Sequence, residues 1–589
     1  MIEYDMTPER DAYLKARGYI VLSACPGSGK TTSIVQKLYS VSQYCKENYG
    51  KHTGFACLSF TNRASDEIKD KYRQMHDEIL EFPNVVSTID SFITQNIILP
   101  FWYLFPSCKT RPQIINEKDV IRQLYFAKGQ YPIPQLRQHK QYLYRYAPEE
   151  ISIDHKGYFC KGRPMQENMK DYCSQVVKMR YESGNITSQD ALVMAVCIVK
   201  KHPEIARTIS RRYPYIIVDE AQDNSYLQFK LFEILIDNGL HNLEFVGDVC
   251  QSIYRYRNAH PELFAALMST EGWQNLHFTD CRRSNQRIID FYSKLRPQDI
   301  PEIKSCGVED KKIPIVVYKH KDGEEKKIID DFRNKVELYG LDTYGIMFRG
   351  HKKLESLSDN KKTLELWKSC IPYMLIDAIH LKQRGDFDQA FRKVRLALAF
   401  AKYGDKYKER NKFISDIEYD LEWNRRIFLL VDRISNFTLS LEDWTILTEN
   451  EIKRILSLSC SIDFQIKSKL PGYHMAELKK ESVSKYFLEI QDKESNVETH
   501  TDTIHSYKGT SLDAVLLFLS KNGKGQSVSL NDFPDQPISK IGDMTERQSM
   551  IYVACSRAKQ FLAIAVPYSV DDNVIAKKFS DVKYSLIKL

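Results

Sequence analysis

The 589-residue sequence has no long hydrophobic run and no cysteine motif. No stretch approaches the roughly 18 consecutive apolar residues that a membrane-spanning helix needs. The 13 cysteines are scattered, without the C-x-x-C pairs of zinc or iron–sulfur sites, which indicates a reducing compartment. The first residues, MIEYDMTPER, lack the basic and apolar regions of a signal peptide. We therefore expect a cytoplasmic protein with no membrane partner.

A strong charge of either sign is also absent. The 85 Lys and Arg residues exceed the 77 Asp and Glu residues by a net charge of +8, which permits a polyanionic partner without requiring one. The 43% hydrophobic and 28% charged residues are typical of soluble globular proteins. The chain is too long for one hydrophobic core, so we expect roughly three to five domains or subdomains.

A phosphate-binding motif follows the short apolar run that begins at Gly18. The run leads into Ala24-Cys-Pro-Gly-Ser-Gly-Lys-Thr31 and then into a helix-like segment. A strand, a glycine-rich turn and a helix form a loop whose backbone N–H groups surround phosphate oxygens. Lys30 is expected at the β- and γ-phosphates and Thr31 at Mg²⁺. The predicted nucleotide-binding residues are Ala24, Cys25, Pro26, Gly27, Ser28, Gly29, Lys30, Thr31 and Thr32.

A second motif supplies the acidic half of a nucleotide site. Tyr215-Ile-Ile-Val reads as a buried parallel strand, and Asp219 and Glu220 stand at its carboxyl end, where open α/β sheets place their ligands. Asp219 is suited to Mg²⁺ coordination, and Glu220 to orienting or deprotonating the attacking water.

These motifs resemble those of the UvrD/Rep group of superfamily 1 helicases. Asp219-Glu220-Ala-Gln-Asp223 resembles motif II of that family. Six further matches occur in the family order along the chain. They are Phe60–Ala64 and Thr88–Phe92 (motifs Ia and Ib), Val246–Ala259 (motif III), Cys281–Ser284 (motif IV), Thr503–Gly509 (motif V) and Tyr552–Ala558 (motif VI).

The resemblance implies an α/β fold with two RecA-like P-loop motor domains, whose parallel sheets are flanked by helices, and two mainly helical insertions. It also implies a division of the chain. The expected parts are 1–92 and 213–275 for the first motor domain, 93–212 for its insertion, 276–349 and 497–589 for the second motor domain, and 350–496 for the second insertion.

The resemblance also assigns catalytic roles. Gln251 senses the γ-phosphate, while Arg283 and Arg557 reach across a cleft from the second motor domain to stabilise charge on the transferring phosphoryl group. Arg282 stands where the family has a tyrosine that stacks on adenine, so it is also predicted to bind the nucleotide, its guanidinium plane covering the base. No glutamine precedes the phosphate-binding loop. Both departures predict relaxed selectivity among nucleotides.

Single-stranded DNA is the partner that the resemblance implies, including junctions with duplex DNA. Aromatic side chains that stack on bases, beside polar and basic groups for phosphates, are typical of such sites. Packing of Phe60, Tyr254 and Tyr256 inside the core remains an alternative. The expected DNA-binding residues are Phe60, Thr61, Asn62, Thr88, Tyr254, Tyr256, Arg257 and His505.

Two functions therefore stay open from the sequence. The first is an ATP- and Mg²⁺-dependent helicase that moves 3′ to 5′ on single-stranded DNA. The second is a DNA-sensing ATPase that regulates a partner nuclease, as in Gabija-type antiviral systems. No nuclease motif is present in the chain itself. A transporter ATPase or kinase is excluded because it has no place for motifs III to VI.

Overall fold

The computed structural model describes most of the chain between residues 4 and 588. The residues left undescribed within that range are 116–125, 128–130, 133, 140, 143–145, 147–149, 155, 161–162, 256–257, 322, 349–365, 384–386, 405, 419, 458–463, 469–474, 485–498, 521–526 and 581. The chain forms two compact units, one of residues 1–351 with 500–589 and one of residues 352–499.

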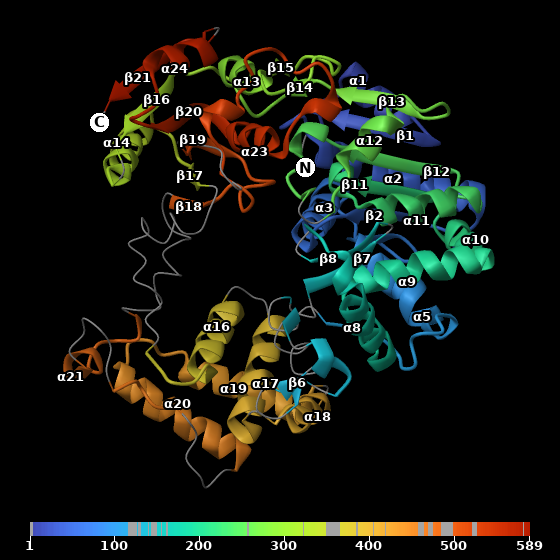
Figure 1. The fold of residues 1–589 in the computed structure, drawn as a ribbon, viewed down its shortest axis with the longest axis vertical. Helices are drawn as coiled ribbons and strands as arrows, with labels where there is room; N and C mark the ends of the chain where they lie inside the picture. The colour runs from blue at the N-terminus through green and yellow to red at the C-terminus, as the bar shows by residue number, and fades with distance from the viewer. Residues whose placement is uncertain are drawn as a thin grey trace. The chain divides into compact units, whose positions relative to one another are not determined.

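The first unit contains a sheet of six parallel strands (Figure 1). Continuous apolar runs such as Tyr215-Ile-Ile-Val form its strands, because both faces of a parallel sheet are covered by helices. The strands, in their order across the sheet, are β13 (Gln274–Phe278), β1 (Tyr19–Ala24), β12 (Asn242–Gly247), β11 (Tyr215–Asp219), β2 (Phe55–Ser59) and β3 (Val85–Thr88). Strand β13 crosses the predicted division at 275/276 and pairs with β1, so the first sheet extends through Phe278.

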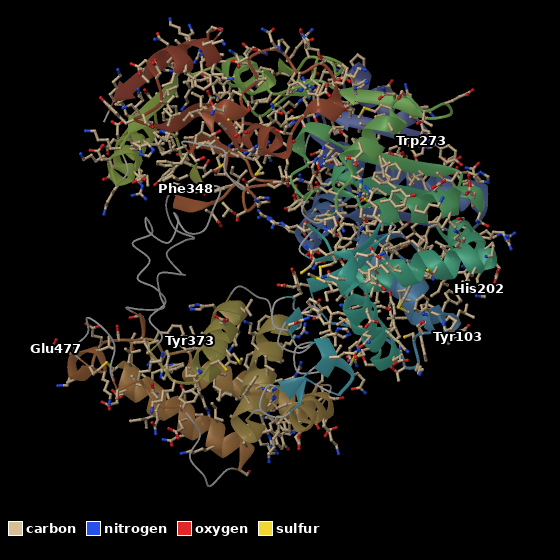
Figure 2. All side chains as sticks on the ribbon, viewed as in Figure 1. Tyr103, His202, Trp273, Phe348, Tyr373 and Glu477 are labelled. Carbon is tan, nitrogen blue, oxygen red and sulfur yellow. The ribbon has the colours of Figure 1, made fainter. Side chains whose placement is uncertain are left out.

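The two faces of this sheet bury alternate residues of each strand. Tyr215 and Ile217 pack into the core beneath helices α1 (Pro8–Lys15), α2 (Lys30–Tyr49) and α3 (Asn62–His76). Ile216 and Val218 face the opposite core. The helices on that side are α4 (Ile89–Ile93), α8 (Lys170–Ser183), α9 (Ser188–Lys201), α10 (Pro203–Arg212), α11 (Tyr226–Asp237) and α12 (Pro261–Leu267). Trp273, labelled in Figure 2, stacks on Phe245 at this core, with ring centres 5.7 Å apart.

An ion pair is fully buried in the core beneath α2. Lys37 Nζ lies 2.5 Å from Glu244 Oε1 of β12, and both side chains have no solvent exposure. The Tyr215 hydroxyl donates a hydrogen bond to the same carboxylate, and the ammonium lies 4.1 Å from the centre of the Tyr13 ring. The pair thus joins α1, α2, β11 and β12 at one point.

The segment between β3 and β11 adds short strands to its helices. Helices α8, α9 and α10 dominate its described part, and π- and 3-10 turns follow α4. The short strands are β4 (Gln113–Ile114), β5 (Phe126–Ala127), β6 (Tyr131–Pro132), β7 (Ile151–Asp154), β8 (Gly157–Cys160), β9 (Arg163–Pro164) and β10 (Asn185–Ile186). Strand β4 pairs with β10, and β7, β8 and β9 form a small antiparallel sheet.

The same unit contains a second six-stranded sheet, which has its own core. Its strands, in spatial order, are β18 (Thr499–Thr503), β17 (Tyr344–Phe348), β19 (Leu512–Phe518), β20 (Ala558–Pro567), β16 (Ile315–His320) and β21 (Tyr584–Lys588). Phe348, labelled in Figure 2, stacks on Phe518 with ring centres 4.4 Å apart. The helices around this sheet are α13 (Gln286–Ser293), α14 (Glu325–Leu338), α23 (Glu546–Cys555) and α24 (Asp572–Lys578), and the short strands β14 (Asp280–Cys281) and β15 (Lys304–Ser305) pair beside it.

The second unit is helical among its described residues. Its core centres on Trp367 and Trp444, whose indole N–H groups donate to Thr445 and to the Ile434 carbonyl. Tyr373 packs its ring edge against Trp367. The helices are α16 (Ile371–Gln383), α17 (Phe387–Tyr403), α18 (Tyr407–Ile417), α19 (Leu421–Ile434), α20 (Leu441–Leu456) and α21 (Met475–Leu478). In neither unit does a described helix have the length and apolar character needed to cross a membrane.

Candidate functional site

The phosphate-binding loop connects β1 to α2 through two glycines in the left-handed region. Gly27 has φ +72° and Gly29 has φ +80°, a backbone that only glycine adopts without strain. A Cβ at Gly29 would lie 2.5 Å from Arg10 Nη2, and one at Gly27 would lie 2.5 Å from Arg283 Cβ. Both glycines are therefore required for the turn, and Gly27 also for the close approach of Arg283.

Lys30 begins α2 and meets the two acids of motif II. Its Nζ lies 3.1 Å from Asp219 Oδ1 and 2.5 Å from Glu220 Oε1. Burial opposes the lysine charge, but the two carboxylates outweigh it and raise the Lys30 pKa. Glu220 is half-buried, and desolvation opposes its charge, yet Lys30 and Lys508 lower the pKa of its carboxyl group. Glu220 is thus held ionised, as a group that accepts a proton or orients water must be.

The predicted metal ligands fit Mg²⁺. Thr31 and Asp219 line the same cavity, and Mg²⁺ prefers oxygen ligands, commonly one or two carboxylates together with substrate phosphates. The Lys30 ammonium already lies beside the Asp219 carboxylate, so that oxygen is oriented toward a positive charge. Among the described residues no cluster of three or more His, Cys, Asp and Glu side chains is arranged to hold a metal ion.

One cavity of about 380 Å³ contains the predicted nucleotide-binding and catalytic residues. Residues near both six-stranded sheets line the cavity. The site is therefore shared between the part of the first unit around the first sheet and the part around the second. The lining comprises the loop residues from Ala24 to Thr32, Asp219, Glu220 and Gln251, then Arg282, Arg283 and Arg557, and also Ala64, Glu67, Lys71, Gly509, Ser511 and Lys559. The last six were not predicted from the sequence.

Two arginines, one after β14 and one just before β20, line this cavity. Arg557 is only 2% exposed, and its Nη2 donates to Gln251 Oε1 over 2.7 Å. Arg283 Nη1 donates to the Ser556 carbonyl over 3.0 Å. Burial, together with the like charge of Arg283, lowers the Arg557 pKa to about 9. An anionic phosphate in the cavity would relieve that repulsion between the guanidinium groups.

Arg282 contacts the N-terminal segment. Its Nη2 pairs with the Asp5 carboxylate, while its backbone N–H donates to the Gly27 carbonyl over 2.9 Å. Arg10 donates to the Ser28 carbonyl over 2.9 Å. No sequence pattern pointed to Arg10, which lies in α1, ahead of β1 and the loop.

Two of the predicted strand-binding aromatics lie side by side. The rings of Phe60 and Tyr254 stack with centres 5.2 Å apart and planes inclined by 27°, and both side chains are half-buried. His505 lies 5.8 Å from the Tyr254 ring and contacts the Ile253 carbonyl over 3.2 Å. Both rings are thus partly exposed, unlike the fully buried aromatic side chains of the core.

The polar residues predicted to contact DNA lie at the N-termini of two helices. Thr61 caps the N-terminus of α3, Asn62 is its first residue, and both are exposed. Thr88 caps α4 through a hydrogen bond from the Ser91 N–H over 3.1 Å. Tyr256 and Arg257, the remaining strand-binding predictions, lie outside the described residues.

Lys508 connects the two sites, although the sequence did not single it out. Its Nζ pairs with the Asp223 carboxylate, lies 3.9 Å from Glu220 Oε2 and donates to the Gln251 carbonyl over 3.1 Å. The same ammonium lies 4.8 Å from the centre of the Tyr254 ring. Burial, which Lys508 opposes, raises the Asp223 pKa to about 6. The Lys508 ammonium thus lies beside Asp223, Glu220 and the Tyr254 ring.

The fold and this cavity define a P-loop nucleotide-binding protein whose site is shared between two parallel sheets. Residues 6–270 match the UvrD/REP helicase N-terminal domain. The chain is 20% identical to a probable DNA helicase II homolog of Mycoplasma pneumoniae, over 96% of this chain and 84% of that protein. The chain thus carries a UvrD/REP helicase N-terminal domain, and its relatives include proteins named DNA helicase II and Rep, as expected for a UvrD-like superfamily 1 helicase.

Other relatives match shorter regions. The ATP-dependent DNA helicase Rep of Buchnera aphidicola subsp. Schizaphis graminum is 23% identical over 62% of this chain and 55% of its own length. The Gabija protein GajB of Bacillus cereus is 26% identical over 48% of this chain and 47% of its own length. The chain therefore spans about half of these two proteins.

Proposed function

We propose that this protein is an ATP-dependent DNA helicase that couples hydrolysis to 3′-to-5′ movement on single-stranded DNA. The observation that carries the proposal is the position of Lys508, which contacts Asp223 and lies near Glu220 in the nucleotide site and beside Tyr254 in the aromatic pair. A change at either site alters the surroundings of the same ammonium group.

The hydrolysis step follows from the groups around the cavity. The loop N–H groups and Lys30 bind the β- and γ-phosphates, and Mg²⁺ held by Thr31 and Asp219 would neutralise charge on their oxygens. Glu220 accepts a proton from the water that attacks the γ-phosphorus, while the bond to the β–γ bridging oxygen breaks and ADP leaves. Arg283 and Arg557 stabilise the charge that gathers on the transferring group.

The strand-binding step uses the half-buried rings. Phe60 and Tyr254 would stack on bases, and Thr61, Asn62 and Thr88 would bind backbone phosphates from helix N-termini. Tyr256, Arg257 and His505 belong to the same proposed path. In this proposal residues 93–212 and 350–496 are the insertions of the two motor domains.

A second function is kept because of two relatives. The Gabija protein GajB is one, and the other is an ATP-dependent helicase/nuclease protein of Streptococcus thermophilus, 31% identical over 24% of this chain and 12% of its own length. The name of the second relative couples a helicase to a nuclease. In that case the chain would sense DNA ends and regulate a partner nuclease, and strand separation by the chain alone would be absent.

A strand-displacement assay distinguishes the two functions. The purified protein is given duplexes with a single-stranded tail of either polarity, and Lys30→Ala serves as the control without hydrolysis. We expect ATP-dependent separation of the 3′-tailed duplex only. ATP hydrolysis stimulated by single-stranded DNA, with no separation of either duplex, would favour the sensing function instead.

A further inference from the structure

The N-terminal segment, residues 4–10, lies behind the phosphate-binding loop and has no part in the proposed hydrolysis. Arg10 is 5% exposed. It donates from Nη2 to the Ser28 carbonyl over 2.9 Å and from Nη1 to the Asp5 carbonyl over 2.6 Å. Its guanidinium also lies 5.1 Å from the centre of the Tyr4 ring, whose hydroxyl donates to Ser33 Oγ of α2 over 2.9 Å.

The hydrogen bond from Arg10 to the Ser28 carbonyl also fixes the direction of the next backbone N–H of the loop. In a planar trans peptide, the carbonyl of one residue and the N–H of the next point in opposite directions. Arg10 holds the Ser28 carbonyl on the outer side of the loop, so the Gly29 N–H points away from Arg10. Gly29 lines the cavity, and the guanidinium packs so closely behind it that a Cβ there would collide with Nη2 at 2.5 Å.

The Gly27 carbonyl, one residue earlier in the loop, is also fixed by a hydrogen bond. The Arg282 N–H donates to the Gly27 carbonyl over 2.9 Å, and the Arg282 side chain pairs with Asp5. A closed ring of contacts results, from Arg10 to Ser28, along the loop to Gly27, through Arg282 to Asp5, and back to Arg10.

We propose that Arg10 is a positioning residue for nucleotide binding, which keeps the Ser28–Gly29 peptide oriented with its N–H toward the phosphates. The inference rests on the proposed function, since it concerns binding of the nucleoside triphosphate that the motor uses. Arg10 touches no reacting atom; it acts through the loop backbone. The Asp5–Arg282 pair extends this support to the second half of the site, but the Asp5 carboxylate is exposed and solvent screens the pair.

The experiment measures nucleotide affinity separately from turnover. The dissociation constant of a fluorescent ATP analogue is measured by titration for the wild type, Arg10→Ala, Arg10→Lys and Asp5→Asn. Arg17→Ala is the matched control, because Arg17 donates to the Leu14 and Ala16 carbonyls in the same N-terminal region. KM for ATP and kcat are measured on the same variants.

Arg10→Ala should weaken binding of the analogue and raise KM by at least about tenfold, because a buried charged hydrogen-bond donor is lost, while kcat at saturating ATP stays within about threefold. Arg10→Lys should bind more tightly than Arg10→Ala but less tightly than the wild type, and Asp5→Asn should change affinity by less than about threefold. If Arg10→Ala does not fold, Arg10→Lys decides.

Wild-type affinity in the Arg10 variants, or a loss in kcat alone, overturns the proposal. A wild type that binds the analogue without hydrolysing ATP overturns the proposed function, and the affinities still decide the role of Arg10.

Discussion

Glu220 is the residue on which the chemistry of the cavity converges. Its two carboxylate oxygens accept hydrogen bonds from Lys30 and Gln222, each over 2.5 Å. Glu220 has φ +54°, a left-handed backbone that is unusual for a residue other than glycine. Such strain is retained at functional sites where the surrounding structure fixes it. The carboxylate is thus positioned by its backbone as well as by its partners.

Substitution of either member of the Lys30–Glu220 pair should abolish most turnover. Lys30→Ala removes the phosphate-facing ammonium, and Glu220→Gln removes the group that accepts the proton from water. Each should lower ATPase activity stimulated by single-stranded DNA by at least about 100-fold. Glu220→Gln should still bind ATP in an equilibrium titration. Near-normal turnover by either variant would contradict the assignment.

Nucleotide choice is also decided by single side chains. Arg10 and Arg282 lie beside the phosphate-binding loop, and their side chains offer only hydrogen-bond donors. Arg10 donates to the Ser28 and Asp5 carbonyls, and Arg282 pairs with the Asp5 carboxylate. Without an amide to read the adenine edge, we expect GTP or CTP to support hydrolysis within about tenfold of ATP. Catalytic efficiency for the four nucleotides at saturating single-stranded DNA tests this. An ATP preference above about a hundredfold would show that another group reads the base.

At the scale of elements, the apolar runs predicted the central strands well. The runs before the phosphate-binding loop and before Asp219 became β1 and β11, because a continuous apolar stretch between turn signals has few other places to be buried. The two-residue strands of 93–212 were not predicted, since so short a pair carries no periodic pattern. The roles of Arg10 and Lys508 were missed for a different reason: their partners are set by tertiary structure, and Lys508 is 285 positions from Asp223.

The aromatic pair between β2 and the loop after β12 should bind bases. Tyr254→Ala should weaken affinity for single-stranded DNA by roughly 1–3 kcal/mol with little change in melting temperature. Tyr39→Ala is the control, because Tyr39 is a 39% exposed ring that stacks on His76. A large fall in melting temperature would show instead that Tyr254 is a packing residue, since emptying a buried aromatic site costs about 3–5 kcal/mol. The same pair of measurements on Tyr256→Ala tests that position.

Removing one charge of the buried pair between α2 and β12 should destabilise the first unit. Lys37→Met leaves the Glu244 carboxylate without its countercharge in the core, which should cost about 3–5 kcal/mol of unfolding free energy. The double variant Lys37→Met with Glu244→Leu should recover much of that loss, because no charge then remains buried. Denaturant unfolding of the three proteins checks both expectations. Equal stability of the single and double variants would argue against an uncompensated charge.

At the scale of the whole molecule, the proposed coupling between nucleotide and strand depends on contacts between the parts of the first unit around its two six-stranded sheets. Lys508 contacts Asp223 and lies beside both Glu220 and Tyr254. Lys508→Met should therefore lower the ratio of DNA-stimulated to basal ATPase activity by at least about tenfold, as expected for a charge-stabilising contact.

Lys559→Met is the matched control for coupling, because Lys559 lines the same cavity but pairs with Asp513. It should keep the wild-type ratio of stimulated to basal activity. If Lys508→Met also keeps that ratio, the coupling runs through other residues. Single-strand affinity measured on both variants separates a loss of coupling from a loss of binding.

The Lys37–Glu244 pair has a further consequence, for the divergence of this chain from its relatives. Proteins sit only a few kcal/mol above the stability they need, and most substitutions reduce it. A lineage that loses one charge of a fully buried pair must pass through an intermediate close to that threshold, whereas the loss of both charges is tolerated. The two positions should therefore change together or remain as they are. Among homologues, a neutral residue at position 37 should accompany a neutral residue at position 244.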